Sequence, residues 1–246
     1  MLTIVYCRGN DKDAPTVAKR SGMRYGTRHD NKPYSTDIYM LDINWEKYIW
    51  SDYMSKVKRY APTIAMVPDY MNSDQLPLLL ERIQEVKKCG VEKVVVCPKF
   101  SGAVADIPND CLVAVSVHTR YAGFLPDASE IIGRQVHLLG GRPDQQQYLI
   151  RHRYNKSNIV SVDGNTFAYR ATTGQFWSLT KPGWKQTRGH RYTSELLELY
   201  SAINIVKYLN NPNSIIRMNK PVSKCMTDEE RKRYGFRDII SSSTTE

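Results

Sequence analysis

Three aspartates in this sequence each follow a short apolar run, and this shared position is its strongest sign of chemistry. They are Asp42, Asp69 and Asp163. If the runs are parallel strands of a barrel, their carboxyl ends meet at one mouth, where such folds keep their reactive groups. Two facing carboxylates can break a glycosidic bond, one as nucleophile at the anomeric carbon and the other as acid and then base. The alternative is that each aspartate caps a helix or forms a turn.

Asp163 fits that alternative least because of the charges around it. It is the only acid between residues 151 and 193, beside eight Lys and Arg and several aromatic residues. Cations can hold phosphates while rings stack on exposed bases, so this pattern favours nucleic-acid binding. The candidate contacts are Arg24, Arg28, Arg170, Lys181 and Lys185. A solvated basic face with the aromatic residues in the core is the alternative.

Other polar residues and glycines at the run ends could contact a substrate. They are Lys99, His118, Arg120, Gly140, Gly141 and Asn165. Lys99 could bind a phosphate or a carbonyl oxygen, with a solvated lysine as the alternative. The two glycines would let backbone approach a ligand that side chains would obstruct. His137 lies within an apolar run and is expected in the core, and Cys97 is expected to be buried and inert.

The apolar runs alternate with helical patterns, which indicates β–α units and a parallel sheet. The expected strands are Leu2–Tyr6, Ile38–Asn44, Thr63–Pro68, Lys93–Cys97, Leu112–Val117, Gln135–Leu139 and Asn158–Val162. The expected helices are Glu46–Tyr60, Ser73–Cys89, Pro143–Arg151 and Ser194–Asn210.

This order predicts an α/β fold, a (β/α) barrel of the TIM type with one irregular or missing strand. An open doubly wound sheet is the alternative architecture. Gln175–Thr180 is a candidate eighth strand or a β-extension. We expect the barrel domain to span residues 1–190, with a C-terminal helix and polar tail in residues 191–246 packed on it.

The amino-acid composition further restricts the class of protein and its expected partners. The chain has 246 residues, 41% hydrophobic and 24% charged, and a formal net charge of +10, which favours a phosphate-bearing partner. No apolar run approaches the ~20 residues that cross a bilayer, so we expect neither a membrane nor a secreted protein. The 5 cysteines are scattered without Cys-x-x-Cys spacing, which argues against disulfides and a cysteine zinc site. We expect a cytoplasmic protein, in the host cytoplasm if it is viral.

Two segments together resemble the tRNA-guanine transglycosylases. Val136–Asp144 (VHLLGGRPD) is similar to the family's penultimate barrel strand and its glycine-rich turn. Ile159–Trp177 is similar to its last strand, with Asp163 in the nucleophile's place. Over residues 1–180 the chain looks closest to the compact, phage-associated DNA 7-deazaguanine transglycosylases, with which it shares Tyr25–Arg28, Val96–Lys99 and Thr119–Gly123.

The resemblance implies replacement of guanine in DNA or tRNA by a 7-deazaguanine base such as preQ0, with Asp163 forming a covalent bond to the sugar. Asp69 or Asp42 would be the acid and base, and Tyr70 or Phe100 would sandwich the base. His118, Arg120 and Tyr121 would bind substrate.

The chain departs from the family by lacking the Cys-x-Cys-x-x-Cys…His zinc motif, so neither metal nor cofactor is expected. Two other functions stay open. One is a non-catalytic nucleic-acid-binding barrel subunit, and the other is an N-glycoside hydrolase acting on free nucleosides.

Overall fold

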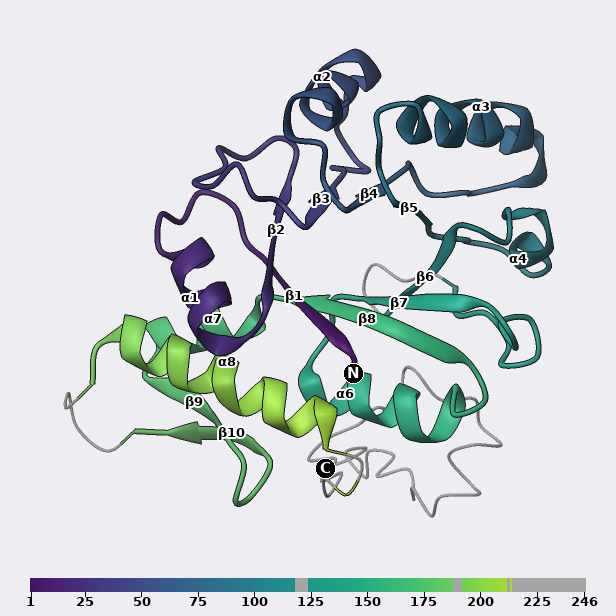
Figure 1. Ribbon diagram of the computed structural model, residues 1–246. Helices are drawn as coiled ribbons and strands as arrows, with labels where there is room; N and C mark the ends of the chain where they lie inside the picture. Colours follow the sequence, from purple (N-terminus) through teal and green to yellow (C-terminus); the bar gives the residue numbers. More distant parts are fainter. Residues whose placement is uncertain (118–123, 188–191, 212, 214–246) are drawn as a thin grey trace, which may run out of the picture.

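The protein is a closed barrel of eight parallel strands that follow one another in chain order (Figure 1). The structure is a computed structural model, and it describes residues 1–117, 124–187, 192–211 and 213. The strands are β1 (Thr3–Cys7), β2 (Arg24–Arg28), β3 (Met40–Asp42), β4 (Ile64–Met66), β5 (Lys93–Val96), β6 (Leu112–Ser116), β7 (Gln135–Leu139) and β8 (Asn158–Gly164). Strand β8 pairs with β1 and closes the barrel. The predicted TIM-type barrel is confirmed, and the open sheet is wrong.

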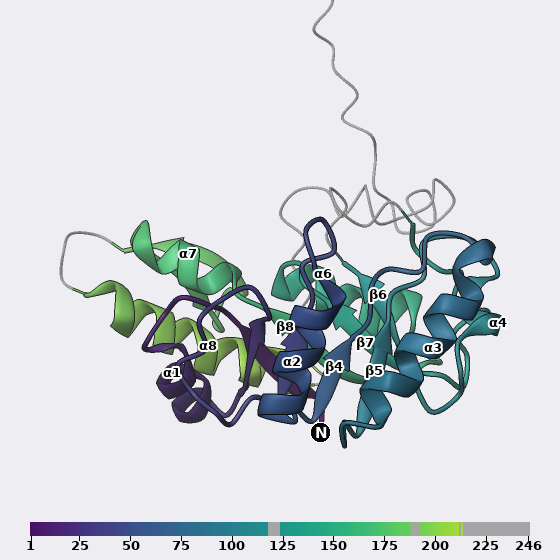
Figure 2. The same ribbon diagram turned by 90° about the horizontal axis from the view of Figure 1, so that it is seen from above.

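Helices surround the barrel (Figure 2). They are α1 (Ala14–Ser21), α2 (Trp50–Tyr60), the 3₁₀ turn η1 (Ser73–Gln75), α3 (Leu76–Lys87), α4 (Ala103–Asp106), α6 (Pro143–Tyr148), the π-helical turn η2 (Leu149–Arg153), α7 (Thr166–Thr172) and α8 (Ser194–Asn210). Helix α2 starts later than predicted because the Asn44 side chain accepts the N–H groups of Glu46 and Lys47, both at 3.3 Å, and holds them in a turn. No helix in the described ranges is both long and apolar enough to span a membrane.

Strand β2 is the strand that the sequence analysis did not find, so no strand of the barrel is missing. Its sequence, RYGTR, is bounded by arginines and has glycine at its centre, so it lacks the apolar character on which the prediction relied. Glycine is needed there because a Cβ on Gly26 would lie 2.7 Å from Val5 Cγ1. Crowding against β1 therefore selects the residue that hides this strand from a sequence pattern.

The candidate eighth strand, Gln175–Thr180, is not part of the barrel. Residues Gln175–Ser178 form β9, which pairs antiparallel with β10 (Gly183–Gln186) in a separate hairpin. Helix α8 holds β9 at Trp177, whose N–H donates to Ser201 Oγ at 3.0 Å and whose carbonyl accepts from Asn204 Nδ2 at 2.8 Å. The segment is thus the β-extension that the sequence analysis left open.

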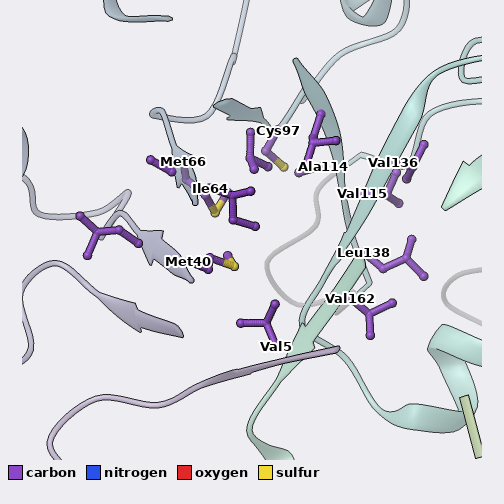
Figure 3. Close-up of a cluster of buried hydrophobic side chains, with 14 of the residues drawn as sticks. Val5, Met40, Ile64, Met66, Cys97, Ala114, Val115, Val136, Leu138 and Val162 are labelled. Atoms are coloured by element: carbon purple, nitrogen blue, oxygen red, sulfur yellow. The ribbon is translucent and has the colours of Figure 1, made fainter. Parts of the chain in front are cut away.

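The core has two layers, one inside the barrel and one between barrel and helices (Figure 3). Successive side chains of a strand point to opposite faces, and residues paired between neighbouring strands share a face. Val5, Met40 and Ile64 therefore point inward, while Val136, Leu138 and Val162 point outward toward the helices. Every apolar strand is buried on both faces, which explains its continuous hydrophobic sequence.

Helix α8 completes the outer wall beside β1, because it packs against α1, α6 and α7. Its N-cap is Thr193, whose side chain accepts the N–H of Leu196. Tyr6 on β1 donates from its hydroxyl to Glu198 Oε1 at 2.6 Å, and Arg8 donates to Glu198 Oε2 at 3.1 Å. The C-terminal helix is therefore joined to the first strand by a buried polar contact.

Replacing Tyr6 by Phe should lower the free energy of unfolding by about 1 to 3 kcal/mol, because it leaves the buried Glu198 carboxylate short of a donor. Urea unfolding followed by circular dichroism measures this. Tyr200→Phe, at a tyrosine of α8 that is 50% exposed, is the matched control and should change stability little. Equal stability of the two variants would contradict the importance of the Tyr6–Glu198 contact.

Candidate active site at the barrel mouth

A cavity of about 520 Å³ opens at the C-terminal mouth of the barrel. Asp42 lines it from the end of β3, Asp69 from the segment after β4, and Asp163 from β8. The structure therefore brings the three predicted aspartates into one cavity. Other predicted site residues that line it are Arg28, Lys99, Gly140, Gly141 and Asn165. The Asn165 side chain donates to the carbonyl of Cys7 at 2.9 Å, joining the ends of β8 and β1.

A bulge in β8 aims Asp163 into the cavity. Val136 pairs with Ile159, but the next residue of β7, His137, pairs with Ser161, so β8 has one extra residue between these pairs. A shift of one residue exchanges the faces of a strand. The bulge thus brings Ser161 and Asp163 to the inner face beside His137.

The Asp163 carboxylate is held by the turn that follows β7. Its Oδ1 accepts the N–H of Gly140 at 2.6 Å, and the residue is only 7% exposed. Gln146 ties the same two segments together, because its Nε2 donates to the carbonyls of Gly140 and Asp163, both at 2.7 Å. Gly141 has a φ of +84°, and a Cβ there would lie 2.4 Å from Val117 Cγ1. Glycine is therefore required for the turn itself.

His137 is buried in the core as predicted, with 0% exposure, yet it also contacts the site. Its Nδ1 lies 2.8 Å from Ser161 Oγ, and its Nε2 lies 3.4 Å from Asp163 Oδ1. The sequence analysis missed this contact. Alternation alone could not reveal it, because the bulge decides which β8 residues face His137.

Asp42 is the acid most altered by its surroundings. Burial and the charge of Asp163 raise its pKa to about 7, although the Ile43 N–H, which donates to Asp42 Oδ1 at 2.7 Å, and the Arg28 guanidinium oppose the rise. An acid that titrates near neutrality can both give and take a proton at physiological pH. Asp42 and Asp163 therefore form a carboxylate pair in one cavity, and Asp42 keeps its proton below about pH 7.

Asp69 has a cationic partner instead. Lys99 Nζ lies 3.2 Å from Asp69 Oδ2, and both side chains are mostly buried. Burial raises the pKa of Asp69, which the Lys99 ammonium partly offsets. Burial lowers the pKa of Lys99, but Cys97 and Asp69 outweigh it and raise the pKa overall. Lys99 is therefore a cation at neutral pH and suits an anionic or carbonyl group of a substrate better than attack as a free amine.

The predicted nucleic-acid contacts are divided among three places. Arg28 ends β2 at the cavity and is paired with Asp30 at 2.5 Å, whereas Arg24 begins the same strand and lies over the Tyr39 ring. Arg24 is therefore separated from the mouth by the length of the strand, which argues against a shared role. Arg170 on α7 stacks over Trp184 of the hairpin. Lys181 and Lys185 also lie on the hairpin.

Tyr70 does not line the cavity, contrary to the expectation that it would sandwich a base. It is 1% exposed, its hydroxyl donates to Asp106 at 2.8 Å, and its ring packs against Phe100. Burial behind the Asp69 segment fixes this position, and residue type alone could not distinguish it from an exposed ring. His118, Arg120 and Tyr121 lie outside the described residues.

The cavity thiol is not a strong nucleophile. Burial raises the pKa of Cys7 well above its usual value, and the charges of Asp42 and Asp163 add to the effect. Burial likewise raises the pKa of Cys97 to about 12, in agreement with the expected inert residue. Across the described ranges, no three His, Cys, Asp or Glu side chains are grouped as ligands for a metal ion. Among the described groups that line the cavity, the three carboxylates are thus the candidates for a nucleophile, an acid or a base.

A closed parallel barrel with such a cavity at its C-terminal mouth places this protein in the class of TIM-type (β/α) barrels. Within that class, the chain belongs to the family described as "Family of unknown function (DUF6610)", whose model matches residues 17–208. The match runs from α1 into α8 and includes all three cavity aspartates.

Two solved structures are similar to this chain at a low level. "PhdJ bound to substrate intermediate" is 12% identical with a TM-score of 0.41, covering 69% of this chain and 68% of that one. Dihydrodipicolinate synthase from Agrobacterium tumefaciens is 7% identical with a TM-score of 0.40, covering 66% of this chain and 62% of that one. The chain thus spans less than two thirds of the synthase. No curated protein matches the sequence.

Replacing Asp42 by Asn should stabilise the protein increasingly as pH rises. The pKa of Asp42 is about 7 in the folded chain and 3.8 as the unperturbed value, so the folded state binds the extra proton. Wild-type stability therefore falls as pH rises through this window, whereas Asn keeps the neutral form. We expect a gain of up to roughly 4 kcal/mol at pH 8 that shrinks toward pH 5, measured by urea unfolding.

Asp52→Asn is the control for this experiment, because Asp52 is an exposed acid on α2. Its stability difference from wild type should stay small and flat over the same pH range. If Asp42→Asn behaved in the same way, the buried, proton-retaining state of Asp42 would be excluded.

Proposed function

We propose that this protein exchanges guanine in a nucleic acid for a 7-deazaguanine base, with Asp163 as nucleophile and Asp42 as acid and base. The observation that supports this most directly is the carboxylate pair, in which a backbone-held Asp163 lines the same cavity as an Asp42 whose pKa is about 7. The resemblance of Val136–Asp144 and Ile159–Trp177 to guanine transglycosylases supports the same assignment. On the same grounds we propose that the protein is an enzyme.

The first half-reaction is a displacement at C1′ of an extruded nucleotide. A carboxylate oxygen of Asp163 bonds to C1′ while the C1′–N9 bond breaks. The electron pair of that bond goes to the departing guanine, which takes the proton of Asp42. Sugar and enzyme are then joined by an ester, and Asp42 is a carboxylate.

The second half-reaction reverses this order with a different base. N9 of the incoming 7-deazaguanine bonds to C1′, the ester bond to Asp163 breaks, and Asp42 recovers a proton from N9. Both steps are substitutions at one carbon, so the reaction needs no cofactor. Asp42 fills the acid and base role better than Asp69, because the Lys99 ammonium faces Asp69 and favours its carboxylate form.

The basic hairpin beside the barrel suits the proposed polynucleotide substrate. Lys181 and Lys185 lie on or next to β10, and Arg170 of α7 stacks over Trp184 of the same strand. Tyr169, on α7, is 69% exposed and offers a ring for stacking. The cations and the exposed ring of α7 and the hairpin could hold the nucleic-acid chain on either side of an extruded nucleotide.

Asp163→Asn should abolish base exchange, because the amide cannot form the ester. It should leave nucleic-acid binding nearly intact, because the basic residues of α7 and the hairpin are unchanged. The assay incubates the protein with DNA or tRNA and labelled preQ0 and counts label in the polymer. Binding is measured by mobility shift. Asp52→Asn is the matched control and should exchange like wild type.

The outcomes separate the competing functions. Undiminished exchange by Asp163→Asn would remove the nucleophile assignment. Binding of polynucleotides without any incorporation by wild type would favour a non-catalytic binding subunit. Release of bases from free nucleosides, at a rate insensitive to salt, would favour an N-glycoside hydrolase.

Lys181→Gln and Lys185→Gln should each weaken polynucleotide binding and lower its salt dependence. Each lost phosphate contact releases one counterion fewer, so the slope of log K against log salt should fall by about 1 per variant. Fluorescence anisotropy over a salt series measures the slope. Lys58→Gln, at an exposed lysine of α2, should leave it unchanged. A slope unaffected by both hairpin variants would place the nucleic acid elsewhere.

A further inference from the structure

We infer that His137 is a positioning residue for Asp163, holding carboxylate oxygen Oδ1 from inside the barrel so that Oδ2 is the oxygen that reacts. The contact itself is present in the structure, and its catalytic consequence rests on the proposed function. His137 is fully buried on β7, and its Nε2 lies 3.4 Å from Asp163 Oδ1. That nitrogen has no hydrogen-bond partner within the described part of the chain, so Asp163 is the group to which it is directed.

The contacts of the two ring nitrogens together favour a proton on Nε2, because Ser161 can serve Nδ1 as a donor whereas Asp163 Oδ1 beside Nε2 can only accept when ionised. Ser161 Oγ lies 2.8 Å from His137 Nδ1, and its hydroxyl can donate to that nitrogen. The proton of a neutral imidazole is then on Nε2, where it faces a carboxylate oxygen. The opposite tautomer would direct a lone pair at Asp163 Oδ1, which is repulsive when the carboxylate is ionised.

Two donors therefore converge on one oxygen. Gly140 N–H reaches Oδ1 at 2.6 Å from the turn after β7, and His137 Nε2 approaches it from within the barrel. In the described residues Oδ2 has no hydrogen bond to a donor, and Asp163 lines the cavity. Holding one oxygen from two directions fixes rotation of the carboxylate and leaves the other oxygen for the substrate.

The same arrangement serves both half-reactions of the proposed exchange. When Oδ2 bonds to C1′, Oδ1 becomes the carbonyl oxygen of the ester; it still accepts the Gly140 N–H and has His137 Nε2 beside it. When the ester breaks, negative charge returns to the carboxylate, and donors already in place stabilise it without rearrangement. The 3.4 Å distance suits such a role, because catalytic hydrogen bonds are often long without substrate and shorten when it binds.

The contact can be tested without any assay of exchange. Long-range ¹H–¹⁵N correlation spectra of the full chain with ¹⁵N-labelled histidine report the tautomer of each ring, and the peaks of His137 are those lost in His137→Gln. We expect the Nε2–H tautomer in wild type and a clear shift of these peaks in Asp163→Asn. Asp52→Asn should not move them. An Nδ1–H tautomer, or His137 peaks that ignore Asp163→Asn, would overturn the inference.

A pair of isosteric variants tests the catalytic role. The amide nitrogen of Gln occupies the place of Nε2 and can reach Asp163, whereas that of Asn occupies the place of Nδ1 and can reach only Ser161. We expect His137→Asn to lower kcat about 10- to 100-fold with KM nearly unchanged, as for loss of a hydrogen bond to a charged group. His137→Gln should recover most of this loss. Equal kcat values for the two variants would contradict positioning through Nε2.

Two serine variants guard against a purely structural effect. Ser161→Ala removes the donor to Nδ1 and should lower kcat, whereas Ser21→Ala removes a buried hydroxyl of α1 that donates to the Ala18 carbonyl and should not. If His137→Asn fails to fold, the kcat of Ser161→Ala and the spectra of wild type and Asp163→Asn still test whether His137 positions Asp163. Spectra that show the contact in a wild-type protein without exchange activity would refute the proposed function and leave the contact standing.

Discussion

The mutual repulsion of buried carboxylates is the constraint on which the mouth of this barrel depends. Three aspartates line one cavity, and a low-dielectric site cannot hold all of them ionised without compensation. Each of the three aspartates has a different partner. Asp163 receives the Gly140 N–H and faces His137, Asp69 receives the Lys99 ammonium, and Asp42 keeps its proton up to about pH 7. Acids of one chemical type thereby differ in their partners, because their surroundings differ.

Much of the fold could be predicted because strands of a parallel barrel are buried on both faces. Continuous apolar runs revealed seven of the eight strands, and β7 was predicted with its observed bounds, Gln135–Leu139. Strand β2 escaped because its crowded centre requires Gly26 rather than an apolar residue. The start of α2 was misplaced because one side chain, Asn44, turns the chain before the helix begins.

The sequence could predict which aspartates line the cavity, but not which side chains contact each of them. A carboxylate after a strand can be recognised from sequence order, so Asp42, Asp69 and Asp163 were found together. Their partners depend on register and loop path, which sequence order does not contain. The β8 bulge places Ser161 opposite His137, and the path after β4 and β5 brings Asp69 to Lys99. For the same reason Tyr70, chosen by residue type, proved to be buried behind the cavity.

Helix α8 is attached near both ends of β1. Glu198 binds the side chains of Tyr6 and Arg8 at the cavity end, and the Asn210 side chain accepts the N–H of Leu2 at 3.1 Å at the other end. The β1–β8 junction is the one place in a barrel where neighbouring strands are not consecutive in the chain, so nothing covalent prevents them from sliding. Helix α8 is anchored at two points along β1 and also packs against α7, which follows β8, so it braces both sides of the junction at which Val5 pairs with Asp163.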